Sequence, residues 1–200
     1  MIINKKIRLA TESDSASMLE IYAPFVRATV ITFEYEVPTV SEFSTRISNI
    51  LKKYPWLVCE INDTVVGYAY ASKFSERPAY DWSVDSSVYI HPSYHRKKIA
   101  SALYNCLFEL LKLQGFYNVY AGVTLSNKKS ESFHESFGFK PVGIYHNVGY
   151  KFGQWHDVKW FELTIKEHII SPKRPKTIDE IQGTKEFESI ISKGLQIIQE

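Results

Sequence analysis

Residues 91–104, HPSYHRKKIASALY, place a run of positive and titratable side chains directly before an apolar helical pattern. The run 95–98 reads His-Arg-Lys-Lys, and the first turn of a helix has unpaired backbone N–H groups and a partial positive charge. A phosphate group is therefore an expected ligand at this junction. Loops that bind phosphate usually contain glycine, and this loop contains none.

A metal site is the other chemistry that this stretch suggests. His91 and His95 are four residues apart, but Pro92 disfavours a helix between them and no third ligand is evident nearby. We therefore expect no metal. Cys59 and Cys106 fall in different expected elements, which favours two buried thiols over a disulfide or a zinc site.

A strand and a helix must position this loop. Residues 83–90 alternate in character and predict a strand, with Asp85, Ser87 and Tyr89 on one face. From residue 99 to residue 111 apolar side chains recur every three or four positions, which predicts a helix that ends at Gly115.

The remaining elements suggest the fold class. We expect a strand at 6–10, a helix beginning at Thr11 or Ser13, a helix at about 41–52, a hairpin over 56–74, a strand at 116–124, a short helix within 126–139, and strands within 140–153 and 155–165. This order, βααβββαβαββ, predicts an α+β fold with a mostly antiparallel sheet flanked by helices.

The character of the chain changes near residue 166. SPKRPK is typical of a linker, and Phe187, Ile190, Ile191, Leu195 and Ile198 form an amphipathic stripe. We predict one domain over residues 1–166 and a linker with a C-terminal helix over 167–200. We expect that helix to dock on its own domain or on a neighbouring subunit.

Composition limits the function classes. The chain has 200 residues and 44% hydrophobic content, and its formal net charge is only +2, so no global field favours nucleic acid or an anionic membrane. The N-terminal stretch has no apolar signal-peptide core, and apolar residues nowhere run together for about 18 positions. We expect a cytoplasmic protein with neither a nucleic acid nor a membrane as partner.

Several motifs in one order resemble a known family. The strand SVDSSVYIHP, the basic loop, the helix and the later NKKSESFHESFGF resemble the acetyl-CoA-binding core of the GNAT acetyltransferases. Within that superfamily, KYPWLVCE, GYAYA, AYDWSVDSSVYI and GYKFGQWHDV look like the phosphinothricin and methionine sulfoximine N-acetyltransferase group. The resemblance covers about residues 7–165. It implies the GNAT fold with splayed central strands, acetyl-CoA as acetyl donor, and a homodimer.

The resemblance also implies the coenzyme contacts. The family loop reads Gln/Arg-x-x-Gly-x-Gly/Ala, so His95 and Lys98 are departures, whereas Ala100 is an accepted variant. A lysine at 98 suits a negative φ, and a positive φ would weaken binding. The alternative is that these cations only decorate a solvated helix start. The expected contacts are Val88, Tyr89, Ile90, His95, Arg96, Lys97, Lys98, Ile99, Ala100, Ser101, Asn127 and Ser130.

Two side chains are implied as catalytic. Asp85 matches a family glutamate that acts as a base on the amine, directly or through water, and His134 could give a proton to the departing thiolate or take one from the amine. Backbone N–H groups near residues 88–90 would stabilise the charge on the acetyl oxygen. The structural alternatives are a loop-bonding aspartate and a structural helix histidine.

The expected acceptor is a small amino-acid-like amine. The segments that resemble the substrate side contain Phe33, Tyr80, Trp82, Tyr89, Lys151, Trp155 and His156. Aromatic rings with a few cations suit a small zwitterion that has a further anionic or sulfoximine-like group. A different amine, such as another amino acid, a polyamine or a protein N-terminus, is the first alternative. A non-catalytic acyl-CoA-binding module is the second.

Overall fold

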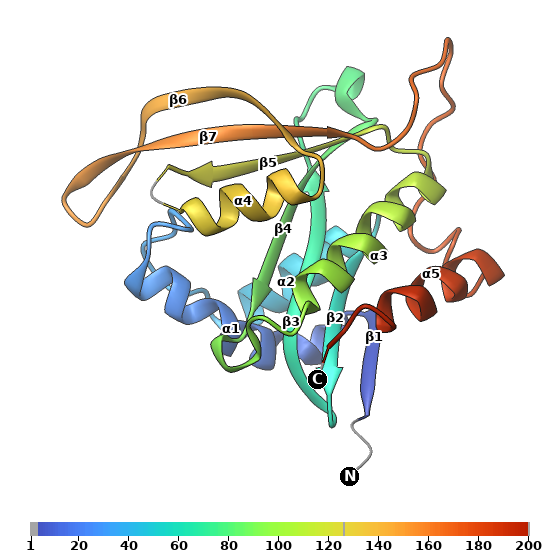
Figure 1. The fold of residues 1–200 in the computed structure, drawn as a ribbon, viewed down its shortest axis with the longest axis horizontal. Helices are drawn as coiled ribbons and strands as arrows, with labels where there is room; N and C mark the ends of the chain where they lie inside the picture. The colour runs from blue at the N-terminus through green and yellow to red at the C-terminus, as the bar shows by residue number, and fades with distance from the viewer. Residues whose placement is uncertain (1–3, 126, 200) are drawn as a thin grey trace.

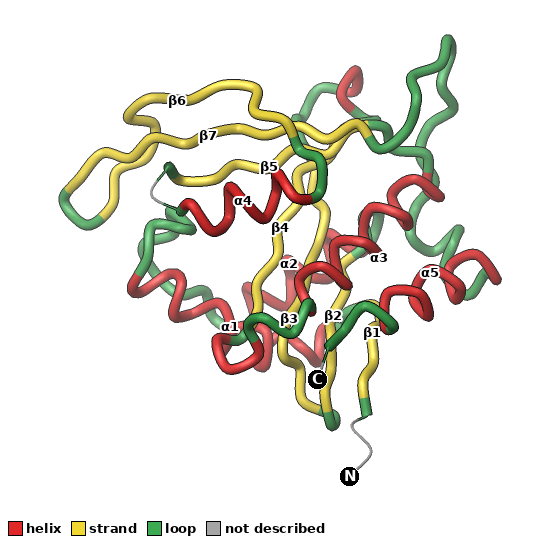
Figure 2. Tube along the Cα trace, in the orientation of Figure 1, coloured by secondary structure: helices red, strands yellow, loops and turns green. Residues whose placement is uncertain are grey.

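The computed structural model of the chain describes residues 4–125 and 127–199 (Figures 1 and 2). Seven strands form one sheet in the order β1-β2-β3-β4-β5-β7-β6. The strands are β1 (Lys5–Leu9), β2 (Trp56–Ile61), β3 (Thr64–Lys73), β4 (Ser83–Ile90), β5 (Asn118–Thr124), β6 (Lys140–Lys151) and β7 (Gln154–Thr164). The α-helices are α1 (Ser15–Ala28), α2 (Val40–Leu51), α3 (Ile99–Gln114), α4 (Lys128–Ser136) and α5 (Lys185–Leu195). This order confirms the expected α+β plan.

Local sequence explains most of these elements. The turn between β2 and β3 has Asn62 and Asp63 at φ 50° and 59°, the left-handed conformation that a two-residue hairpin turn needs. Helix α3 ends at Gly115, whose φ of 102° gives a left-handed C-cap. The expected helix after Thr11 differs in detail, because a short 3-10 turn at Glu12–Asp14 precedes α1.

The sheet separates two helical layers. Trp56 and Val58 of β2 pack with α1 and α2, whereas the alternate residues Leu57 and Cys59 pack with α3 and α5. This alternation follows from the two-residue period of a strand. Cys59 and Cys106 are free and buried, as expected.

The two central strands diverge. β4 pairs in parallel with β5 over only three residue pairs, from Ser83 opposite Asn118 to Asp85 opposite Tyr120. All other neighbouring strands are antiparallel. Beyond Asp85 the strands separate (Figure 1), so the edge of β4 from Ser86 to Ile90 has no partner strand on the β5 side.

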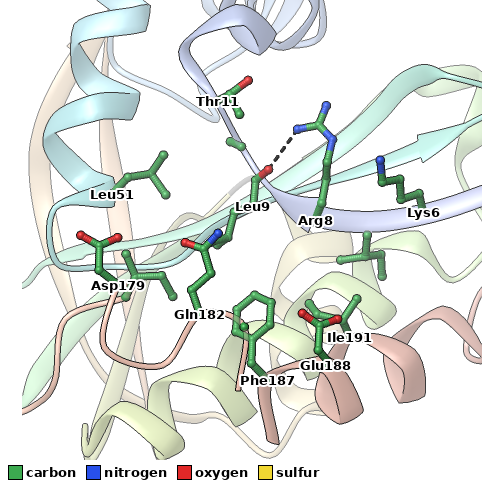
Figure 3. A pocket seen from close by; sticks show the side chains of 14 residues that line it. Lys6, Arg8, Leu9, Thr11, Leu51, Asp179, Gln182, Phe187, Glu188 and Ile191 are labelled. Atoms are coloured by element: carbon green, nitrogen blue, oxygen red, sulfur yellow. Dashed lines mark hydrogen bonds between the residues drawn. The ribbon is translucent and has the colours of Figure 1, made fainter. Parts of the chain in front are cut away.

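The C-terminal helix packs on the same domain. Phe187 and Ile191 of α5 belong to the core cluster that includes α3. Gly194 permits a close approach, since a Cβ there would overlap Sγ of Cys106. Between this segment, the end of α2 and the edge strand β1 remains a cavity of about 500 Å³ (Figure 3). Among the described residues, no helix is long and apolar enough to cross a membrane.

Candidate active site

The basic loop before α3 has the alternating signs of φ that are typical of an anion-binding nest. Arg96 and Lys98 have φ values of 64° and 56°, whereas Lys97 between them is not among the positive-φ residues. Alternation of this kind turns successive N–H groups toward one side of the chain. Both Arg96 and Lys98 are strained, because a left-handed conformation costs a non-glycine residue about 1–2 kcal/mol. The loop therefore makes its concavity without glycine.

A cavity of about 250 Å³ lies at this loop. Its lining consists of Ile90, Tyr94, His95, Arg96, Lys98, Ile99, Ala100, Ser101 and Phe133. Arg96 and Lys98 are exposed, so their charges are available to a phosphate. His95 lies close to the carbonyl of Ile90, with Nε2 3.1 Å from its oxygen, and so fastens the loop to the end of β4.

A second, smaller cavity of about 70 Å³ opens where β4 and β5 separate. It is lined by Ile31, Ser86, Ser87, Val88, Tyr89, Tyr104, Ala121, Gly122, Ser130 and His134. These residues come from both faces of β4, so the gap connects the two sides of the sheet. The unpaired edge of β4 offers backbone N–H groups here, which fits an acyl oxygen.

Asp85 lies on the α1 side of the sheet. It shares a face with Tyr89, whose ring packs edge-on against Tyr22 and Phe25 of α1. Oδ1 of Asp85 is buried with no hydrogen-bond partner. Burial raises the pKa of Asp85 to about 7. A carboxyl in this state suits a base that works near neutral pH.

An aromatic group lies beside Asp85. Tyr120 is its register partner on β5, and the Tyr120 ring stacks on Phe74 with centroids 4.4 Å apart. Phe74 in turn contacts Tyr80 edge-on at 5.7 Å. Tyr80 is therefore linked to Tyr120 through Phe74.

His134 lies on the opposite face, with Tyr104 of α3. Nδ1 of His134 is 2.8 Å from the carbonyl oxygen of Ser130, which can only accept, so Nδ1 donates its hydrogen there. Nε2 is then the acceptor for the hydroxyl of Tyr104 at 3.3 Å. Burial lowers the pKa of His134 and raises that of Tyr104, so both are neutral near pH 7.

Tyr104 was not among the residues expected in the site. It is fully buried, and the hydroxyl of Ser86 on β4 lies 3.4 Å from its own. The available signal was a polar aromatic residue inside the apolar stripe of α3, and this signal does not distinguish a core tyrosine from a site tyrosine. The hydrogen-bond partners of Tyr104 become visible only in the fold, where α3 packs beside α4 and β4.

Asn127 and Ser130 lie at the start of α4. Oδ1 of Asn127 accepts a hydrogen bond from the backbone N–H of Ser130 at 3.1 Å, so Asn127 is the N-cap of the helix. Ser130 also lines the smaller cavity. Capping accounts for the position of Asn127 without a coenzyme.

Lys151 does not face the acceptor side as a free cation. Its Nζ donates to the carbonyl oxygens of Val26, Thr29 and Thr32, each at 2.8 Å, and the residue is 2% exposed. All three ammonium hydrogens are therefore used by backbone. The expected contact between Lys151 and the substrate is corrected: this lysine fastens the loop after α1.

The other residues expected on the substrate side are dispersed. The Phe33 ring stacks on that of His156 with centroids 6.1 Å apart, and both lie with the loop that Lys151 holds. Trp155 is 62% exposed near the tip of the β6–β7 hairpin. Trp82 donates its indole N–H, the only polar group of its side chain, to the carbonyl of Lys173, which places this ring against the segment after β7.

No metal site is found within residues 4–125 and 127–199, where no three His, Cys, Asp or Glu side chains are grouped to hold an ion. Nδ1 of His91 accepts from the backbone N–H of Ser93. This contact gives His91 a local capping role.

Comparisons with known proteins identify the family. Residues 7–160 match the model of the acetyltransferase (GNAT) domain. A phosphinothricin N-acetyltransferase of Streptomyces viridochromogenes is 35% identical over 85% of this chain and 92% of its own. An L-methionine sulfoximine/L-methionine sulfone acetyltransferase of Salmonella typhimurium is 31% identical over 81% and 95%. The solved structure of a phosphinothricin acetyltransferase from Sinorhizobium meliloti with acetyl-CoA superposes with a TM-score of 0.81, at 31% identity over 88% of this chain and 96% of that one.

The described residues fit the coenzyme: an anion-binding nest and two exposed cations at the start of α3, and an open strand edge for an acyl group. The chain belongs to the GNAT acetyltransferases, as an N-acetyltransferase that uses acetyl-CoA as its acetyl donor.

Proposed function

We propose that this enzyme acetylates the primary amine of a small amino-acid-like acceptor such as phosphinothricin or methionine sulfoximine. Relatives with these named activities, at 35% and 31% identity, support the acceptor class. The observation that supports the mechanism most is the gap between β4 and β5, which has a buried carboxyl on one face and the Tyr104–His134 pair on the other.

Asp85 is the proposed base on the amine. Acetyl-CoA supplies a thioester, and attack on it requires a neutral amine, which an amino-acid ammonium becomes only by losing a proton. With a pKa of about 7, the Asp85 carboxylate is substantially present at neutral pH, and it accepts that proton directly or through one water. The rate should therefore rise with pH through about 7.

Tyr104 and His134 are the proposed source of the proton for the departing sulfur. The Tyr104 hydroxyl gives its proton to the thiolate as the carbon–sulfur bond breaks, and the tyrosine oxygen then regains a proton from solvent. Neutral His134 positions this hydroxyl, because its Nδ1 donates to the carbonyl of Ser130 and its Nε2 accepts from Tyr104. Backbone N–H groups of β4 between Ser86 and Ile90 are the proposed donors to the acetyl oxygen.

The remaining proposals are the binding roles of residues 95–101 toward the coenzyme phosphates and of the Phe33–His156 and Phe74–Tyr80 groups toward the acceptor. A homodimer and a cytoplasmic location stay predictions. Light scattering on the purified protein tests the first, since a mass of one 23.1 kDa chain would contradict it.

The decisive experiment follows acetyl-CoA-dependent release of free thiol, with phosphinothricin, methionine sulfoximine and a polyamine as parallel acceptors and mass spectrometry of the products. We expect turnover with one of the first two. Turnover with the polyamine alone would contradict the acceptor class. Acetyl-CoA binding by calorimetry without turnover on any amine would favour a binding module.

A further inference from the structure

We propose that residues 196–199, here called the brace, support the coenzyme loop (residues 95–98) on the side away from the phosphates. Docking of the brace would then set the affinity for acetyl-CoA. The backbone N–H of Gln199 donates to the carbonyl oxygen of Lys97 at 3.0 Å. Lys97 is the middle residue of the nest, between the two left-handed residues Arg96 and Lys98. The inference rests on the proposed contacts of residues 95–101 with the coenzyme.

The geometry of a peptide unit explains how this bond reaches the phosphate side. In a trans peptide the C=O of one residue and the N–H of the next point in opposite directions. The carbonyl of Lys97 points toward Gln199, so the N–H of Lys98 points away from it. The bond from Gln199 thus fixes the direction of a nest donor without touching the ligand.

This loop has particular need of such support. The family pattern has glycine where Lys98 stands, and glycine reaches a positive φ without the penalty that a lysine has. With φ at 56°, Lys98 stays in this conformation only if its surroundings favour it. A fixed partner for the adjoining carbonyl provides that preference.

The brace is itself well anchored. Ile198 is 6% exposed within the core cluster, and its carbonyl accepts a hydrogen bond from Nζ of Lys5 on β1 at 3.2 Å. Farther back, Sγ of Cys106 contacts the carbonyl of Ile190, so α5 is attached to α3 itself. In Figure 1 the C-terminal end of the chain lies between β1 and the start of α3.

The brace lies outside the residues that the family model matches, which end at 160. The chain thus combines a loop that lacks the family's glycine with a segment, beyond the matched domain, that contacts this loop. We infer that the second feature compensates for the first.

The test compares Gln199→Pro with Gln199→Ala in the full chain. Proline removes the N–H, and alanine keeps it while removing the same exposed side chain. Calorimetry should show about 3- to 10-fold weaker acetyl-CoA binding for the proline variant, as for one lost hydrogen bond, and a change below about 2-fold for the alanine variant. The KM for the acceptor and kcat at saturating acetyl-CoA should not change.

A second pair of variants distinguishes a specific effect on the loop from a general loss of stability. Lys5→Met removes the bond to Ile198, whereas Lys6→Met removes an equal charge from an exposed neighbour on the same strand. We expect weaker acetyl-CoA binding only for Lys5→Met, and faster amide hydrogen exchange at residues 97–99 in both Gln199→Pro and Lys5→Met.

Two results would overturn the proposal. Equal acetyl-CoA affinities for folded Gln199→Pro and Gln199→Ala would show that the loop does not depend on this bond. If the unaltered protein and all variants fail to bind acetyl-CoA, the coenzyme site itself is wrong, and the brace falls with it. A weaker affinity for Gln199→Pro with an intact site distinguishes the two cases.

Discussion

The two faces of β4 show opposite effects of the same physical cause. Burial disfavours the charged form on both sides, yet it raises the pKa of Asp85 to about 7 and lowers the pKa of His134. Asp85 has an unpartnered oxygen, whereas both ring nitrogens of His134 have partners. One face thus holds a carboxyl that is ready to accept a proton, and the other holds a neutral, fully bonded pair.

The faces also differ in how they are assembled. On the coenzyme side, β4, the basic loop and α3 follow one another directly in the chain. On the proposed acceptor side, hydrogen bonds join the loop after α1 to residues about 100 positions away. The Thr124 hydroxyl donates to the carbonyl of Val30 in this loop, and the hydroxyl of Tyr35 in the loop donates to the carbonyl of Tyr150. The loop proposed to bind the coenzyme therefore lies between consecutive elements and has one distant backbone contact, from Gln199, whereas the loop on the proposed acceptor side is held by several tertiary contacts.

The largest effect that tests this comparison is expected at Asp85. Asp85→Asn removes the proposed base and nearly preserves the shape of the side chain, so kcat should fall about 10²- to 10⁴-fold. The remaining rate should also lose the rise through pH 7, because no carboxyl of raised pKa is left to deprotonate. The measurement is the pH dependence of kcat from pH 5.5 to 9.

Asp85→Glu provides the matched control. A glutamate keeps the proton-accepting group at one methylene more, so most of the activity and a pH-dependent rise should return. If the pH–rate profile of Asp85→Asn equals that of the unaltered enzyme, Asp85 is not the base, and the face of β4 that lies toward α1 has only a structural role.

A smaller effect is expected on the other face. Tyr104→Phe and His134→Gln should each lower kcat about 10- to 50-fold by interrupting one proton path, a moderate share of what acid–base catalysis typically contributes. Because the two residues act as a unit, the double variant should be about as slow as either single variant. If the loss of kcat in the double variant equals the product of the two single losses, Tyr104 and His134 act independently. That result would contradict their proposed action as a unit.

The features that were predictable from the sequence are those determined within one contiguous segment of the chain. The order of the elements, the strand containing Asp85 and the helix after the basic loop all follow from short-range periodicity and turn residues. The divergence of β4 and β5 was expected only through the family resemblance, since no local pattern reports where two strands stop pairing.

Side-chain partners from distant segments were not predictable. A lysine beside aromatic residues suggested a ligand cation, but Lys151 meets three carbonyls more than 100 positions earlier in the chain. Tyr104 looked like an ordinary member of a helical core. The bond from Gln199 to Lys97 joins two segments whose contact depends on how α5 packs against α3. Such contacts depend on the fold as a whole.

The smallest effect is expected for the clamp on the acceptor side. Lys151→Met fills a similar volume but leaves the carbonyls of Val26, Thr29 and Thr32 without their donor, so the loop that holds Phe33 should loosen. We expect the KM for the acceptor to rise about 10-fold, which corresponds to about 1.4 kcal/mol, while the Kd for acetyl-CoA changes less than about 2-fold.

Lys140→Met removes an equal charge from an exposed position on the same strand and should change neither constant. This pair of variants separates a specific clamp from a general effect of charge. The split between the two constants matters most, because a general loss of folding would lower activity without raising one KM alone. If acetyl-CoA binding weakens as much as acceptor binding, the two sides of the sheet are not independent, and the distinction between local and tertiary assembly fails.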